Sequence, residues 1–187
     1  MTLRDLLREN KSEIVRRWQE YVLAAHHADA TRFFMTEGDR FANPVGYALR
    51  SGTDAIFDGL VNGMSAEEVC RHLEPIMKAR AIQDWPPSQA VSFVFALKGA
   101  IREEIVKDLS GPLPAVELDE IDAQIDQIAL FAFDIYTRCR EKVAELRINE
   151  IKRSVAAVFQ KLGVDQAQPQ PAADGDADGG SARGGVR

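Results

Sequence analysis

Cysteine is scarce in this sequence, and the two cysteines present form no motif. Cys70 and Cys139 lie far apart in the 187 residues, and the chain has only three histidines. Zinc sites and disulfide frameworks need several such side chains at short, regular spacing. The sequence therefore predicts no metal site and no disulfide, and we interpret both cysteines as buried free thiols.

Net positive charge and long apolar runs are missing as well. The formal net charge is −6, and lysines and arginines are interleaved with acids. Proteins that bind nucleic acid cluster Lys and Arg on one face, so nucleic acid is not an expected partner. No stretch approaches the ~18 uncharged apolar residues of a membrane span, and the N-terminal MTLRDLLRENK has no apolar signal core. We expect a soluble, cytoplasmic protein without membrane insertion.

Strand-like alternation of apolar and polar residues is absent, and apolar residues instead recur at spacings of three and four. This periodicity predicts an all-α fold. The first helical segment, residues 2–25, has a weak point between Glu9 and Ser12 where one helix hands over to another. Trp18 is its expected core anchor.

Capping residues mark the ends of the helices that follow. One helix should start at Asn43–Pro44 and end at Gly63, and the next should start with a Ser65–Glu68 capping box. Pro75 should split or bend that second helix. Inside the first of them recur Gly46, Gly52 and Gly59. Each costs about 1 kcal/mol against alanine in a helix interior, which close helix packing or a ligand against the backbone would compensate.

A double proline, Pro86–Pro87, separates this pair of helices from the most apolar helix in the chain. Proline lacks a backbone donor, so it suits the first turn of a helix and interrupts a continuing one. The helix that follows has almost no polar face, and it must be surrounded by others. Its expected end is at Ser110–Pro112.

Beyond Pro114 a very long helical pattern begins. In its last part the apolar residues form a stripe that is rotated around the helix relative to the earlier apolar residues. The stripe steps by three and four residues through Ile148, Ile151, Val155, Val158 and Leu162. Such a seam, as the extension of a helix already nucleated by the domain, predicts dimerisation. From residue 163 to 187 the composition turns to Gln, Pro, Ala, Asp and Gly, which predicts a disordered tail.

No catalytic constellation stands out. Serine lacks a nucleophile motif, and Cys70 and His72 are two residues apart and so do not share a helix face. Glu103 and Glu104 would suit acid–base chemistry if buried, but a charge run of this kind is typical of a solvated helix face. We therefore expect no enzyme activity.

Four stretches resemble the N-terminal domain of RsbRD-type RsbT co-antagonist proteins. They are LLRENKSEIVRRW, DRFANPVGYALRSGTDAIFDGL, RAIQDWPPSQAVSFVFALK and FDIYTRCREKVAELRINEIKR, and the resemblance covers residues 3–153. It implies a globin-like helical bundle without haem, usually dimeric, in stress signalling. Where a haem globin has its proximal histidine, this chain has Ala81 or Ile82, neither of which ligates iron, so no cofactor is expected.

Relatives of this family carry a STAS output domain after a linker helix, and this sequence has only the tail there. The expected organisation is a sensor domain at 1–147, a helical extension and dimer seam at 148–162, and the tail at 163–187. The resemblance implies a non-catalytic signalling module that acts through homodimerisation and binding of an unidentified protein partner. The alternatives are a small-ligand sensor with an apolar pocket near Trp85, or an accessory protein of a membrane redox complex.

Polar residues at predicted helix starts and connections, within the family-like segments, are candidates for a ligand or partner surface. With the corner tryptophan they are Arg40, Asn43, Tyr47, Gln83, Asp84, Trp85 and Gln89. Capping of helix ends is the other interpretation of the polar ones, because helix ends leave backbone groups unsatisfied without any ligand.

Overall fold

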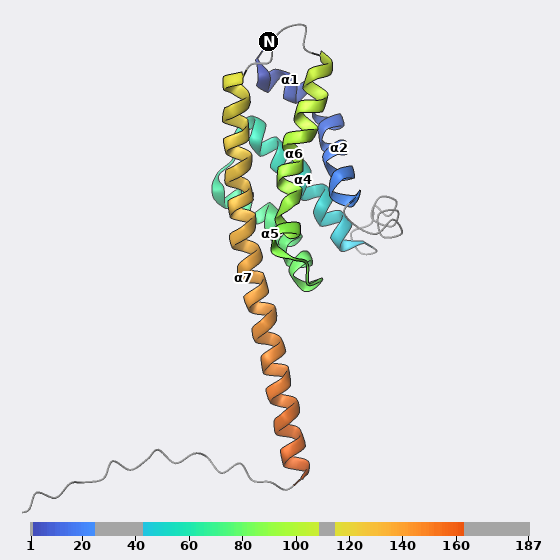
Figure 1. The fold of residues 1–187 in the computed structure, drawn as a ribbon, viewed down its shortest axis with the longest axis vertical. Helices are drawn as coiled ribbons and strands as arrows, with labels where there is room; N and C mark the ends of the chain where they lie inside the picture. Colours follow the sequence, from blue (N-terminus) through green and yellow to red (C-terminus); the bar gives the residue numbers. More distant parts are fainter. Residues whose placement is uncertain (1, 25–42, 109–114, 163–187) are drawn as a thin grey trace, which may run out of the picture. The chain divides into compact units, whose positions relative to one another are not determined.

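The computed structural model describes residues 2–24, 43–108 and 115–162, and within these ranges the chain forms six helices and no strand. The helices are labelled in Figure 1: α1 (Leu3–Glu9), α2 (Lys11–Ala24), α4 (Pro44–Asn62), α5 (Ala66–Ile82), α6 (Pro87–Asp108) and α7 (Ala115–Lys161). The predicted all-α fold with a long C-terminal helix is confirmed. The predicted tail and Arg40 lie outside the described residues.

The helix ends follow the local capping signals. Asn10 separates α1 from α2, inside the predicted weak point. Asn43 caps α4 by accepting a hydrogen bond from the Gly46 amide at 2.8 Å, and Gly63 ends that helix at φ 87°. Both halves of the Ser65–Glu68 capping box are present at the start of α5. These ends depend on neighbouring residues only, and the sequence therefore predicts them well.

Of the two outcomes expected at Pro75, a split or a bend, the split is wrong, because α5 runs unbroken from Ala66 to Ile82 with Pro75 inside it. Packing against α4 supports α5 along this stretch. A Cβ atom on Gly52 of α4 would lie 2.8 Å from the Cδ1 atom of Ile76 and 3.0 Å from the backbone oxygen of His72. At Gly52, therefore, close helix packing accounts for the glycine.

The core is built around α6, which packs against α1, α2 and α5. Trp18 of α2 is fully buried; its indole stacks on Phe93 of α6 at a centroid distance of 6.1 Å and donates a hydrogen bond to the Phe93 carbonyl at 2.6 Å. The expected neighbours of the apolar helix are thus present. Phe95 and Val106 of α6 are nonetheless about half exposed, at 48% and 58%.

Contacts divide the chain into two compact units, residues 1–147 and 148–187. Cys70 and Cys139 belong to the first unit and are free thiols, as expected, but both are half-buried rather than buried. No helix among the described residues is long and apolar enough to cross a membrane.

Candidate functional site

The double-proline corner between α5 and α6 is built on a buried arginine. Arg80 is 4% exposed, and one guanidinium nitrogen donates to the carbonyls of Gln89 and Ala90 at 3.2 and 2.8 Å. The guanidinium carbon lies 4.8 Å from the ring centre of Trp85 and 4.6 Å from that of Phe93. Burial lowers the pKa of Arg80 to about 10, so the side chain is a cation at neutral pH. Aromatic faces and carbonyls stabilise this charge.

Helix α7 holds the same corner from the other side. The Tyr136 hydroxyl donates to the Trp85 carbonyl, and Arg140 donates to the Asp84 carboxylate and, at 3.1 Å, to the Ala81 carbonyl. Asp84 has φ 63°, a left-handed backbone conformation that is uncommon for residues other than glycine, asparagine and aspartate. The sharp turn is therefore fixed by contacts from α6 and α7 together.

An open hollow of about 340 Å³ lies at this corner. Its lining includes Trp85, both prolines, Phe133 and Tyr136, with Asp84 and Arg140 on the polar side. This is the place where the sequence predicts an apolar pocket. The hollow is of a size that holds a small ligand, and its lining is aromatic with a few polar groups.

The other residues predicted to form a ligand or partner surface do not lie together: some are at the double-proline corner and others are on α4. Gln83 caps the C-terminus of α5, and Gln89 supplies a carbonyl to Arg80. Tyr47 lines a second hollow of about 340 Å³ with Pro75 and His72, while Asn43 is 2% exposed and caps α4. The interpretation of these residues as caps holds for Asn43 and Gln83.

The two positions at which a haem globin would have its proximal histidine differ in burial. Ala81 is fully buried in the core, and Ile82 is 58% exposed.

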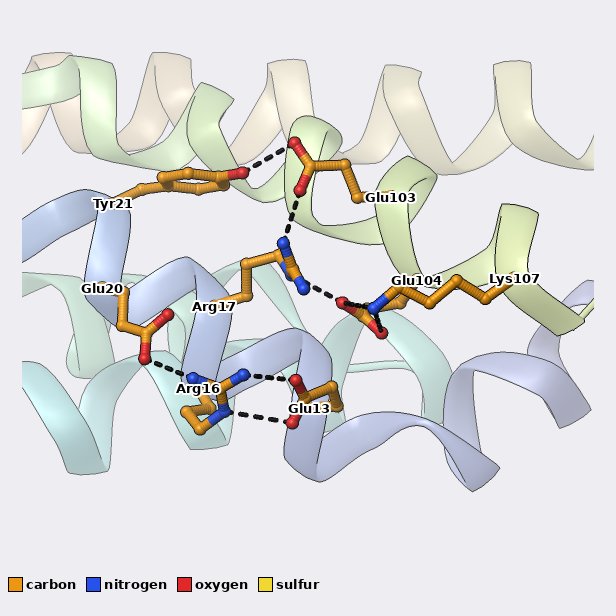
Figure 2. Close-up of polar contacts among 8 residues, drawn as sticks. All are labelled: Glu13, Arg16, Arg17, Glu20, Tyr21, Glu103, Glu104 and Lys107. Carbon is orange, nitrogen blue, oxygen red and sulfur yellow. Dashed lines mark hydrogen bonds and ion pairs between the residues drawn. The ribbon is translucent and has the colours of Figure 1, made fainter.

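A second group of polar residues, which sequence reasoning missed, joins α2 to α6 (Figure 2). Glu104 of α6 is 4% exposed, so the expectation that this charge run is a solvated face is wrong at Glu104. Its carboxylate lies 2.5 Å from Arg17 Nε and 2.7 Å from Lys107 Nζ. The neighbouring Glu103 accepts hydrogen bonds from Arg17 at 2.7 Å and from the Tyr21 hydroxyl at 2.6 Å.

We call these residues, with Glu13, Arg16 and Glu20, the α2–α6 charge cluster. Hydrogen bonds and ion pairs within it shift several pKa values. The hydrogen bond from Tyr21 lowers the pKa of Glu103, and the same contact raises the pKa of the phenol. Hydrogen bonding with Tyr21 and Glu103, together with the negative charge of Glu104, raises the pKa of Arg17. On the rim of the cluster Arg16 pairs with Glu13 and Glu20 along α2 and lowers the pKa of Glu13.

One nitrogen in the cluster is poorly satisfied. Arg17 Nε is buried and makes no hydrogen bond, although Glu104 Oε1 is only 2.5 Å away, because the carboxylate lies off the N–H direction. The contact between Arg17 and Glu104 is therefore close enough for an ion pair but lacks the geometry of a hydrogen bond. The sequence signal for this cluster is the position of Glu104, which follows the apolar residues Leu97, Ala100 and Ile101 at helical spacing.

Helix α7 presents apolar side chains that are exposed. The predicted dimer seam residues are exposed by 46–68%: Ile148, Ile151, Val155, Val158 and Leu162. Earlier on the same helix, Leu130 and Phe133 are exposed by 60% and 49%.

The fold is thus an all-α bundle with a buried cationic corner and a long terminal helix that carries exposed apolar residues. A family model described as the RsbT co-antagonist protein rsbRD N-terminal domain matches residues 12–151. The chain belongs to this family, which places it with the N-terminal domains of RsbR-type signalling proteins. Searches of curated proteins and of solved structures found no significant match.

Proposed function

We propose that this chain is a non-catalytic signalling module that works as a homodimer and binds a protein partner. The observation that carries the proposal is the exposed apolar stripe from Ile148 to Leu162 on α7. Solvent-exposed apolar residues at regular helical spacing mark an interaction surface, since a monomer gains nothing from displaying them. Membership in a family of signalling domains supports the same function.

The geometry of the seam suits a second copy of the same helix. Its five residues step by three and four, which is the a/d pattern of a coiled coil. At about 1.5 Å per residue the seam is about 21 Å long, or two heptads. Two heptads are marginal alone, but α7 is a 47-residue helix whose earlier turns pack in the core.

A second apolar surface is available within the first unit, where α6 and α7 run antiparallel. Lys98 pairs with Asp126 at 2.7 Å, and Arg102 pairs with Asp122. One turn further along each helix come Phe95 and Leu130, which are exposed by 48% and 60%. Because they continue the same two stripes, these side chains and Phe133 form a patch at which a dimer or partner can pack.

The absence of catalysis is part of the proposal. The acids that would suit acid–base chemistry, Glu103 and Glu104, are each held by cations or by Tyr21 in the α2–α6 charge cluster. These contacts hold both carboxylates within the cluster instead of presenting them to a substrate.

Light scattering during gel filtration tests the dimer, with Val155→Asp as the disrupting change. We expect the wild-type chain to be a dimer at micromolar concentration and the variant to shift to monomer. Gln160→Asp is the matched control, because residue 160 lies on the helix face opposite the seam. A monomeric wild type, or equal behaviour of the two variants, would contradict dimerisation through this seam.

A ligand sensor is the second candidate function, and the hollow at Trp85 favours it. Aromatic and proline side chains with Asp84 and Arg140 give it an apolar floor and two polar contacts. Native mass spectrometry of protein purified without refolding should then find a small molecule bound. The change Phe133→Asp, which places a charge on the lining, should abolish that binding; binding that survives it would place the ligand elsewhere.

A further inference from the structure

The two cysteines of the chain, which are far apart in sequence, line the same hollow. Cys70 comes from α5 and Cys139 from α7, and the space between these helices has a volume of about 450 Å³. Both thiols are free and half-buried, so a small reagent can reach them without unfolding the protein. We call this space, with its two cysteines, the thiol hollow.

Cations outnumber acids by one along this hollow. Arg71, Arg138 and Lys142 line it, against Glu67 and Glu74. Arg71 pairs with Glu67 at 3.5 Å. Within the described residues, however, neither Arg138 nor Lys142 makes an ion pair with an acid. Two cations beside two thiols favour the approach of a reagent that carries carboxylates.

Metal binding fits this hollow less well than covalent chemistry. No group of three or more cysteine, histidine or acidic side chains within the described ranges is placed to hold a metal ion. Two thiols with neighbouring cations are instead the setting for thiol–disulfide exchange, in which a thiolate attacks one sulfur of a disulfide.

We propose that the thiol hollow is a modification site that takes a small anionic disulfide of the glutathione type and holds one adduct per chain. The volume is in the range of a pocket for a single small ligand, and both cysteines line it, so we expect one adduct to block the second. This inference does not depend on the dimer, because both cysteines lie in the first unit.

The exchange balances without any further oxidant. One protein thiol loses its proton to water, and the thiolate attacks the near sulfur of the reagent RSSR. A new S–S bond to the cysteine forms as the RS–SR bond breaks, and RS⁻ leaves and takes up a proton. The reagent is the oxidant: one of its sulfurs leaves as a reduced thiol, and excess thiol reverses the reaction.

The two thiols differ in their surroundings. Burial, and secondarily the Glu74 carboxylate, raise the pKa of Cys139, which leaves less of it as thiolate at neutral pH. In a Cys70→Ser variant, where Cys139 alone remains, the rate of exchange should therefore keep rising with pH beyond the ordinary thiol range.

Intact mass spectrometry after incubation with oxidised glutathione tests the stoichiometry. We expect one glutathionyl group on the folded wild type, one on Cys70→Ser and one on Cys139→Ser, and none on the double variant. The same wild-type chain unfolded in guanidinium should take two. Two groups on the folded protein, none, or a Cys70–Cys139 crosslink without an adduct would overturn the proposal.

A second measurement tests the role of charge. The double change Arg138→Gln with Lys142→Gln should slow exchange with oxidised glutathione about two- to fivefold, in line with the small energies of exposed charge contacts. Exchange with the uncharged hydroxyethyl disulfide should slow less, because Arg138 and Lys142 also lower the pKa of Cys139 and their loss leaves less thiolate for either reagent. An equal effect on both reagents, or no effect on either, would contradict selection of an anionic disulfide.

Discussion

Helix α7 consists of two stretches that have the same spacing of apolar residues and opposite burial. In the first, Ile121, Ile125 and Ile135 are exposed by 3% or less. In the second, Ile151, Val155 and Val158 are exposed by 46–62%. Periodicity therefore shows that a helix has an apolar face, and it does not show whether the same chain covers that face. The first stretch is covered by its own bundle, and the second we assign to a partner copy.

Truncation inside the covered stretch should have the largest effect. Ile125→Ala removes a fully buried side chain from the core and should lower the free energy of unfolding by about 2–5 kcal/mol. Urea denaturation followed by circular dichroism measures it. Ile151→Ala, measured at a concentration low enough to keep the chain monomeric, is the matched control and should stay within about 0.5 kcal/mol. Equal losses of unfolding free energy in the two variants would contradict the difference in burial between the two stretches of α7.

A charge in the exposed stretch should affect association instead of folding. Val158→Asp should raise the dimer dissociation constant at least tenfold, about 1.4 kcal/mol, because it buries an unpaired carboxylate in the seam. The thermal midpoint of the wild type should rise with protein concentration, and that of the variant should not. A wild-type midpoint independent of concentration would argue against association under these conditions.

The covered stretch also makes polar contacts, and their loss should have a smaller effect. Tyr136→Phe removes only the hydroxyl that donates to the Trp85 carbonyl. The expected cost is about 0.5–1.5 kcal/mol of unfolding free energy, with the helical content unchanged. Thr137→Val, a nearby exposed residue whose hydroxyl contacts its own helix, serves as the control. No loss in Tyr136→Phe would mean that the α6 contacts and Arg140 fix the corner without this hydroxyl.

The smallest effect is expected at the ion pairs between α6 and α7. Asp126→Asn removes the pairing with Lys98 on a largely exposed face and should cost about 0.2–1 kcal/mol. Denaturation at low and high salt should show the cost shrinking as salt screens the pair. A cost that is independent of salt would point to packing instead of charge.

Sequence reasoning succeeded where the cause is local. The caps at Asn43 and at Ser65–Glu68 and the handover at Asn10 each depend on residues within one turn. The all-α fold followed from periodicity, and the family followed from the resemblance over residues 3–153. Trp18 was identifiable as a core anchor because a large apolar side chain on an amphipathic helix faces inward.

The failures have a common physical cause, which is contact between distant segments. Glu104 can be buried because α2 brings Arg17 beside it, and the residues around position 104 in the sequence do not indicate this partner. Arg80 is buried because Trp85 and Phe93 enclose it, although arginine is rarely found inside. Pro75 was expected to split or bend its helix, and α5, which packs against α4, is not split there. The shared hollow of Cys70 and Cys139 likewise required the arrangement of α5 and α7.

The partners of Arg80 have a consequence for behaviour in acid. Two rings and two carbonyls hold this cation, and none of them titrates as pH falls. Glu103 differs, because its folded pKa is lowered: its contribution is present above the unfolded pKa and is lost as pH drops through the folded value. Acidification should therefore weaken the Glu103 contacts with Tyr21 and Arg17 while the Arg80 contacts at the double-proline turn persist, so the two polar groups should respond differently to acid.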